Sequence, residues 1–143
     1  MSADLKAIYH RLNEEAWNKR NFDLIDELMS PDLVAHWQDG TETGFEEYKS
    51  GAMNALNTFP DFHYTIDHVI VEGDTLAAYF TFRGTHKGPM SQPNLEATGK
   101  TVTAVGMGLY RFEGGKVAEM WIVNDAFGFY QQLGAIPPLG EDE

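Results

Sequence analysis

Asp125 is the residue best placed for acid–base chemistry, because it follows the last predicted strand at the end of a glycine-rich hairpin. Gly114-Gly115 is typical of a two-residue hairpin turn, which would pair Glu113 with Lys116. Counting back from this turn places the following residues on one face of the sheet: Ala104, Gly106, Gly108, Trp121 and Asp125. Three small residues opposite a large ring and a carboxylate leave empty volume, so the spacing predicts a ligand pocket with Asp125 in its wall.

The same residues also fit a purely structural interpretation. Gly106 and Gly108 can relieve strain in a bent strand while Trp121 fills the space above them. Asp125 directly precedes a predicted short helix over 126–133, and its side chain is of the type that caps a helix N-terminus. The sequence leaves both interpretations open.

Removal of a proton from carbon sets two requirements on such a pocket. An apolar wall makes a carboxylate a stronger base, because burial disfavours its charged form. A hydrogen-bond donor must also face the oxygen on which negative charge develops. The candidate donors are His86, His36, Tyr79 and Trp37. The two aromatic residues among these donors are more typical of an ordinary core. The candidate wall residues are Trp121, Met107, Phe80 and Phe127.

Several other kinds of site have no support in the sequence. No His-x-x-x-His spacing occurs, and His63 and His68 lie five apart on one predicted strand, so they point to opposite faces. Gly106-Met107-Gly108 lies inside a strand and lacks the third glycine of a dinucleotide-binding loop. Cysteine is absent, and no Gly-x-Ser-x-Gly elbow is present. We therefore expect no metal and no cofactor.

Length and charge restrict the class of protein. A chain of 143 residues predicts a single domain, which we place at 1–136, followed by an acidic, solvated tail at 137–143. Ten basic and 22 acidic residues give a net charge of −12, which disfavours binding to nucleic acid or to an anionic membrane. No apolar run approaches the ~20 residues that span a bilayer. The N-terminus lacks the pattern of a signal peptide, so we expect a cytoplasmic protein.

The apolar spacing predicts helices in the first half of the chain and strands in the second. Steps of three and four indicate helices over about 3–19 and 45–57, and a short helix between them ends before Ser30-Pro31. Beyond a short strand at 33–37 and the third helix, alternation after Pro60 predicts four strands joined as an antiparallel meander. This order indicates an α+β fold: a conical barrel in which three N-terminal helices cover one face of a curved, mostly antiparallel sheet.

The other face of this sheet would be open. Alternation assigns five apolar residues to it: Val105, Met107, Leu109, Met120 and Ile122. Because these side chains need cover, we expect a symmetric homodimer that packs sheet to sheet through the open face.

An ordered set of short motifs runs through the chain. It consists of Phe59-Pro60-Asp61, Glu72-Gly73-Asp74, Gly84-Thr85-His86-Lys87-Gly88, Thr98-Gly99-Lys100, Tyr110-Arg111-Phe112 with Gly114-Gly115-Lys116, then Trp121, Asp125 and Gln131-Gln132-Leu133-Gly134. His36 and Gly44-Phe45 precede this set. Over about 5–136 the pattern resembles the SnoaL-like polyketide cyclase (ester cyclase) family of the nuclear transport factor 2-like superfamily, which implies a conical α+β barrel with a ligand cavity.

The resemblance also implies roles for individual residues. Asp125 falls where the family's cyclases keep an acid/base aspartate, which removes a proton from an activated carbon of a polyketide methyl ester before an intramolecular aldol closure. In those cyclases a histidine on the neighbouring strand assists, whereas the strand over 101–112 contains none here. His86 or His36 is the candidate substitute.

We therefore expect an enzyme that performs cofactor-independent acid/base chemistry on a small apolar carbonyl compound, such as a polyketide-like ester. One alternative is a non-catalytic dimer that binds a small lipophilic ligand. Another is hydrolysis of an epoxide or ester by water that Asp125 activates.

Overall fold

The computed structural model describes residues 4–91 and 94–136, so the tail expected at 137–143 lies outside the described residues. The elements follow one another in this order: α1 (Leu5–Arg11), the π-helix η1 (Leu12–Asn18), α2 (Asp23–Leu28), β1 (Met29–Trp37), β2 (Glu42–Thr43), α3 (Phe45–Thr58), β3 (His63–Glu72), β4 (Thr75–Thr85), β5 (Met90–Ser91), β6 (Asn94–Leu95), β7 (Thr101–Glu113), β8 (Lys116–Asn124) and α4 (Ala126–Leu133).

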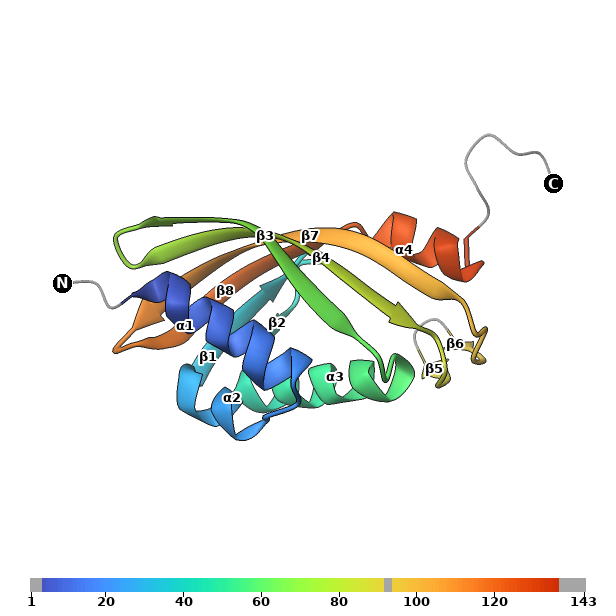
Figure 1. Cartoon of the computed structure of the whole chain (residues 1–143), viewed down its shortest axis with the longest axis horizontal. Helices are drawn as coiled ribbons and strands as arrows, with labels where there is room; N and C mark the ends of the chain where they lie inside the picture. Colours follow the sequence, from blue (N-terminus) through green and yellow to red (C-terminus); the bar gives the residue numbers. More distant parts are fainter. Residues whose placement is uncertain (1–3, 92–93, 137–143) are drawn as a thin grey trace.

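A curved, six-stranded mixed sheet is the frame of the fold (Figure 1). Its strand order is β2-β1-β8-β7-β4-β3, and its neighbours are antiparallel except for β1 and β8, which are parallel. The sheet arches over α1, η1, α2 and α3, which lie on its inner side. The predicted α+β fold, with N-terminal helices packed on one face of a curved sheet, is confirmed.

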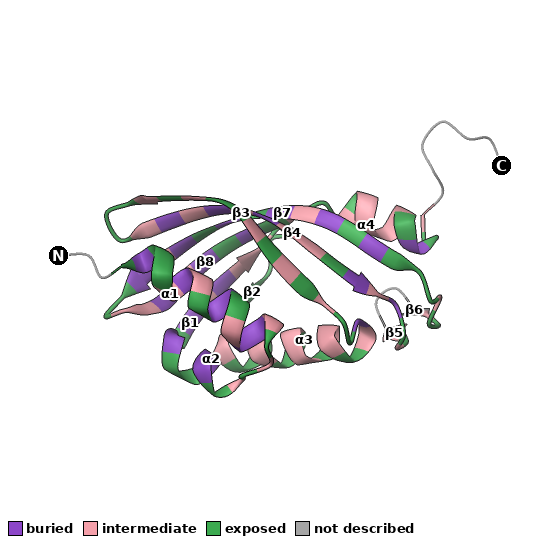
Figure 2. Cartoon of the chain, in the orientation of Figure 1, coloured by how far each residue is buried: buried purple, intermediate pink, exposed green. Residues whose placement is uncertain are grey.

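Most of the core lies between the inner face of the sheet and the first helices (Figure 2). The apolar stripe expected over 3–19 is present, with Tyr9, Leu12 and Ala16 almost completely buried. The helix begins after Asp4, whose carboxylate accepts a hydrogen bond from the backbone N–H of Ala7. At the other end of the chain, α4 ends at Gly134, whose φ of +83° is the left-handed conformation that glycine allows.

The hairpin between β7 and β8 begins as predicted and then departs from the expected register. Glu113 pairs with Lys116 and Phe112 with Val117, but Arg111 pairs with Glu119, so Ala118 is an extra residue that forms a β-bulge. Beyond the bulge the alternation of β8 is reversed relative to the sequence-based count. The predicted pairs of Gly108 with Trp121 and of Gly106 with Val123 are therefore wrong.

The bulge exchanges the two faces of β8. Gly108 pairs with Ile122 and Gly106 with Asn124, whose side chains lie on the inner face, whereas Trp121 lies on the outer face opposite Leu109. Met120 and Ile122, which the sequence assigned to the outer face, are buried on the inner one. The inner face thus gains an amide and loses a tryptophan.

Among residues 4–91 and 94–136, none of the helices has the length and apolar content needed to cross a membrane. The cytoplasmic location and the absence of nucleic-acid and membrane partners stay predictions.

Candidate functional site

A cavity of about 720 Å³ opens between α3, α4 and the inner face of the sheet. Its wall is mainly apolar, with Phe59, Phe62, Phe82 and Phe129 among the lining residues. Other lining residues are polar: Gln38, Asp39, Thr41 and Glu47. A site of this size with a mostly apolar wall suits a small organic molecule better than an ion or a polymer.

Two smaller compartments adjoin the main cavity. Trp37 and Tyr64 line all three spaces, so the compartments lie side by side around these two rings. The first, of about 190 Å³, lies against α3, where Gly51, Ala52 and Ala55 leave room. The second, of about 70 Å³, forms the inner end of the site next to α1 and the middle of β7 and β8.

Polar side chains gather at this inner end, although most of the wall is apolar. The Tyr9 hydroxyl of α1 donates a hydrogen bond of 3.2 Å to the Tyr110 hydroxyl of β7, and the two ring centroids lie 4.7 Å apart. Asn13 and Asn124 line the same compartment. Burial raises the pKa of Tyr9 to about 12, with hydrogen bonds from its neighbours opposing the shift, so this phenol stays protonated near neutral pH.

Glycine is required at positions 106 and 108 because neighbouring side chains of the protein, and not a ligand, lie close to the backbone there. A Cβ atom at position 108 would lie 2.6 Å from the Tyr110 hydroxyl and 2.8 Å from Ile122 Cδ1. A Cβ atom at position 106 would collide with the Asn124 side-chain oxygen and lie 2.7 Å from the Phe80 ring. The expectation that these glycines keep a hollow open is therefore corrected, because neighbouring side chains fill the space above them.

Asp125 lies at the rim of the cavity between two lining residues, Asn124 and Ala126. It is exposed, and its carboxylate accepts a hydrogen bond of 3.0 Å from the backbone N–H of Gly128, which makes it the N-cap of α4. The expectation of a buried carboxylate aimed into the pocket is wrong for this conformation. The structural alternative, a helix cap, is what the chain adopts.

His86 is completely buried but does not line the cavity. Its Nδ1 contacts Thr98 through the hydroxyl at 3.0 Å and the backbone N–H at 3.2 Å. Its Nε2 has no hydrogen-bond partner among the described residues. The ring lies beside Phe59, with 5.5 Å between the centroids, so Phe59 is the contact through which His86 adjoins the cavity wall.

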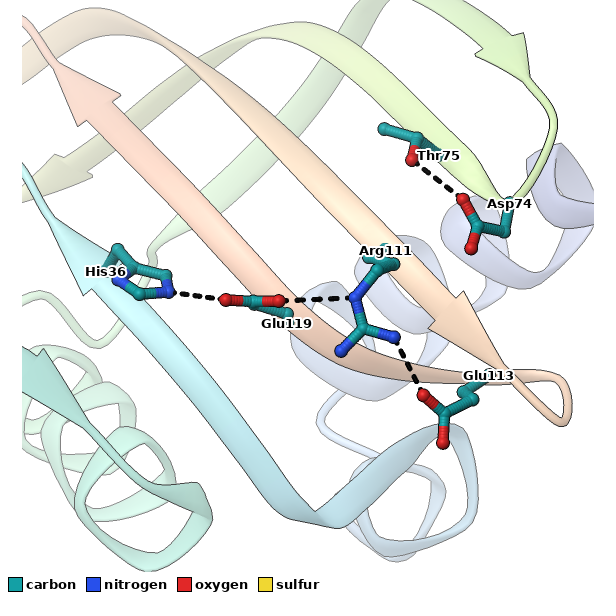
Figure 3. Close-up of polar contacts among 6 residues, drawn as sticks. All are labelled: His36, Asp74, Thr75, Arg111, Glu113 and Glu119. Atoms are coloured by element: carbon teal, nitrogen blue, oxygen red, sulfur yellow. Dashed lines mark hydrogen bonds and ion pairs between the residues drawn. The ribbon is translucent and has the colours of Figure 1, made fainter.

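His36 lies on the outer face of the sheet, away from the cavity (Figure 3). Its Nε2 donates to Glu119 at 2.7 Å, and Glu119 in turn accepts from Arg111 at 3.2 Å. The hydrogen bond from His36, and after it the one from Arg111, lowers the pKa of the Glu119 carboxyl. Arg111 also pairs with Glu113 at 2.7 Å, and His36 Nδ1 lies 3.2 Å from Glu42, so these side chains form one continuous polar chain.

The remaining expected site residues divide between the two faces. Trp37 and Phe80 line the site, as the sequence predicted, and Trp37 donates a hydrogen bond of 2.8 Å to Thr43. Tyr79, Met107 and Trp121 lie on the outer face of the sheet. The side chains of β4 and β7 alternate between the two faces without a bulge, which places Tyr79 and Met107 outside. In β8 the bulge reverses this alternation, which places Trp121 outside as well. Phe127 is exposed on α4. For these four residues the placement in the cavity wall is corrected, and the catalytic roles of Asp125, His86 and His36 stay predictions.

Sequence reasoning missed the polar inner end. Tyr9 was part of an apolar helical stripe, and Asn13 was one of its polar neighbours, so nothing set them apart from a packed core. Tyr110 appeared only as part of a family motif. Asn124 directly precedes Asp125 at the end of the last predicted strand, and its side chain is of a type that also caps helices, so nothing pointed to a cavity. No group of three or more ligating side chains that could hold a metal ion occurs within 4–91 and 94–136.

The chain belongs to the SnoaL-like polyketide cyclase family, because the family model matches residues 7–133. No curated protein sequence matches the chain. Among solved structures, AclR from Streptomyces galilaeus, for which a hydroxylase activity has been suggested, is 27% identical and has a TM-score of 0.86. The match covers 99% of this chain and 87% of AclR.

Two further structures have the same architecture. TsrD from Streptomyces laurentii is 27% identical, with a TM-score of 0.80 and coverage of 94% of this chain and 100% of TsrD. A SnoaL-like polyketide cyclase from Agrobacterium tumefaciens is 22% identical, with a TM-score of 0.77 and coverage of 93% and 100%, which shows the fold alone. Names that include both a hydroxylase and a cyclase indicate that this fold does not fix one reaction.

The cap geometry gives a testable prediction for Asp125. We expect Asp125→Ala to lower the free energy of unfolding by about 1 kcal/mol, because α4 loses its N-cap, and to lower Tm by about 3 °C. Asp125→Asn keeps a capping oxygen and should unfold close to the parent chain. Thermal unfolding followed by circular dichroism measures both. Equal loss in the two variants would show that the carboxylate charge, and not the cap, stabilises this end of the fold.

Proposed function

We propose that this member of the SnoaL-like polyketide cyclase family binds a small, mainly apolar carbonyl compound in the cavity and transfers protons on it without a cofactor. The observation that carries the proposal is the distribution of polarity in the site: a mainly apolar wall that ends in hydroxyl and amide groups. An apolar body would fill the main cavity, and a carbonyl oxygen would reach the polar inner end.

The charge of the site supports an uncharged ligand. Among the described residues that line the three spaces there is no Lys or Arg to neutralise an anion. Asp39 and Glu47 in the main cavity, together with the net charge of −12, disfavour approach of a ligand that is already negative. A neutral carbonyl compound, such as a polyketide-like ester, needs no cation to neutralise it and is not repelled by these negative charges.

Asp125 is the base in this proposal. Its backbone joins two lining residues, and its carboxylate reaches the substrate after it leaves the backbone N–H of Gly128. Loss of a cap costs about 1 kcal/mol. That cost is small beside the roughly 3–5 kcal/mol by which a positioned general base lowers a barrier.

A second candidate function is binding without catalysis. It is favoured by one specific observation: the Asp125 carboxylate is exposed and already engaged as a cap. Under this alternative the same apolar cavity holds a lipophilic ligand that leaves unchanged. Hydrolysis is the third alternative, and it would incorporate oxygen from labelled water into the product of an ester or epoxide probe, whereas proton transfer alone would not.

We also propose that the outer face of the sheet pairs with the same face of a second copy. Six large apolar side chains are exposed among the described residues, and five of them lie on this face. They are Ile70, Met107, Leu109, Trp121 and Val123. The charged groups beside them are already paired in the chain of His36, Glu119, Arg111 and Glu113 (Figure 3).

The net charge does not prevent a second copy from binding at this face. Two molecules that each carry −12 repel one another except through surfaces where charge is absent or balanced. The outer face meets this condition at its centre, since Met107, Leu109 and Trp121 are apolar and Arg111 is paired with Glu113 and Glu119. An isologous dimer would cover both patches at once.

Deuterium exchange tests the catalytic proposal without knowledge of the natural substrate. We expect the protein to accelerate exchange at the carbon next to the carbonyl group of 2-tetralone in D₂O, followed by NMR. Asp125→Asn, which retains a capping oxygen, should slow this exchange about 100-fold or more. Ligand-observed NMR reports binding in the same samples. Binding without any exchange by the parent chain would contradict catalysis and leave the binding function.

Sedimentation velocity at micromolar concentration tests the dimer. We expect a dimer for the parent chain, and we expect Leu109→Glu to raise the dissociation constant about 100-fold or more, because each copy would place a charge in an apolar interface. Ala7→Glu adds the same charge on exposed α1, on the helical side of the fold, and is the matched control. A monomeric parent chain, or equal effects of the two substitutions, would contradict this interface.

A further inference from the structure

Four tyrosines from four different elements converge on the inner compartment. Tyr9 comes from α1, Tyr48 from α3, Tyr64 from β3 and Tyr110 from β7. None of the described residues that line this compartment carries a carboxylate, an ammonium, a guanidinium or an imidazole group. The Trp37 indole N–H is already donated to Thr43, so phenol and amide groups are the polar side-chain groups that the described lining offers to a ligand there.

The hydrogen bonds within this group leave donors available to a ligand. Because Tyr9 donates to Tyr110, the proton of the Tyr110 hydroxyl remains free to be donated onward. The Tyr64 hydroxyl has no hydrogen-bond partner among the described residues, and its ring lines all three spaces. A hydroxyl that accepts one hydrogen bond becomes a better donor in the next, so Tyr9 strengthens the donor capacity of Tyr110.

These phenols stay protonated near neutral pH. Burial raises the pKa of Tyr64 and of Tyr110 well above the ordinary value of 10, and the neighbouring phenols act in the same direction. A protonated phenol donates a hydrogen bond without charge of its own. The phenols can thus donate hydrogen bonds to a ligand oxygen that becomes negative, and they add no negative charge of their own.

Gly108 fixes the position of the strongest donor. The Tyr110 hydroxyl lies directly over this glycine, where any Cβ atom would come within 2.6 Å of it. Tyr110 contacts Tyr9 on its other side, with the ring planes at 53°. The hydroxyl is therefore held between a strand and a helix before any ligand arrives, which is the preorganisation that stabilises developing charge most effectively.

We infer that the inner compartment is an oxyanion subsite, in which Tyr110 and Tyr64 donate hydrogen bonds to an enolate- or phenolate-type oxygen and Tyr9 supports Tyr110. This inference rests on the proposed function, since it concerns the same cavity. It narrows the substrate class to compounds that enter neutral and place negative charge on one oxygen: aromatic hydroxy compounds, or ketones and esters with an acidic neighbouring carbon.

Two probes of equal size separate the subsite from general apolar binding. 2-Naphthol and 2-methylnaphthalene have the same ring body, but 2-naphthol alone offers an oxygen. We expect the full chain to bind 2-naphthol about tenfold more tightly, which corresponds to hydrogen bonds at one end of the ligand. Tyr110→Phe and Tyr64→Phe should each reduce this preference and leave the affinity for 2-methylnaphthalene unchanged.

Two more variants test whether the effect depends on where the tyrosine hydroxyl group lies. Tyr79→Phe removes the same hydroxyl from the outer face, next to Met107, and should leave the preference intact. Gly108→Ala keeps every tyrosine but displaces the Tyr110 hydroxyl, so it should act as Tyr110→Phe does. Circular dichroism of each variant confirms that it is folded before its affinities are compared.

The absorbance of bound 2-naphthol tests whether the subsite favours the anion. If the tyrosines stabilise an oxyanion, the bound probe should ionise at lower pH in the parent chain than in Tyr110→Phe, by about one pH unit for a tenfold effect. Identical ionisation in the two proteins, or equal affinities of the parent chain for both probes, would overturn the subsite while leaving the cavity as an apolar binding site. Failure of both probes to bind would overturn the proposed function itself.

Discussion

A single extra residue in β8 determines which chemistry faces which side of the sheet. Without the bulge at Ala118, Trp121 would point into the cone opposite Gly108, and the space between sheet and helices would be filled by an indole. With the bulge, Ile122 and Asn124 point inward instead. Trp121 moves to the outer face, where its ring stacks on His36 at 5.0 Å. The amide on the inner face and the exposed indole on the outer face are thus two consequences of one local irregularity.

The inner end of the site depends on the glycines of β7 in a related way. A side chain at 106 or 108 would exclude Asn124 and Tyr110 from the positions that they hold. Because both positions lack a Cβ atom, polar groups reach a region that is otherwise aliphatic and aromatic. There the low polarity of the surroundings keeps the phenols neutral and strengthens the hydrogen bonds that they make.

The sequence was sufficient for the architecture but not for the faces of β8. Helical spacing, alternation after Pro60, the Gly114-Gly115 turn and the glycine at 134 each depend on neighbours in the chain, and the structure agrees with them. The bulge was not readable, because Met120, Trp121, Ile122 and Val123 are all apolar and either register satisfies a sheet with two apolar faces. The pocket expected beside Gly106, Gly108 and Trp121 is therefore absent from that place, because none of these residues lines the cavity. Asp125 adopts the helix cap that the sequence had left open as an alternative.

The same arrangement leaves α3 incompletely packed. None of its residues is fully buried, although Phe45, Tyr48, Ala52 and Leu56 are in partial contact with the core. Tyr48, Ala52 and Leu56 border open volume where a packed protein would have neighbours, and open volume in a core lowers stability. A ligand that fills the cavity supplies the missing contacts, so its binding stabilises the folded state in proportion to its affinity. The packing of α3 is therefore complete only when a ligand occupies the cavity.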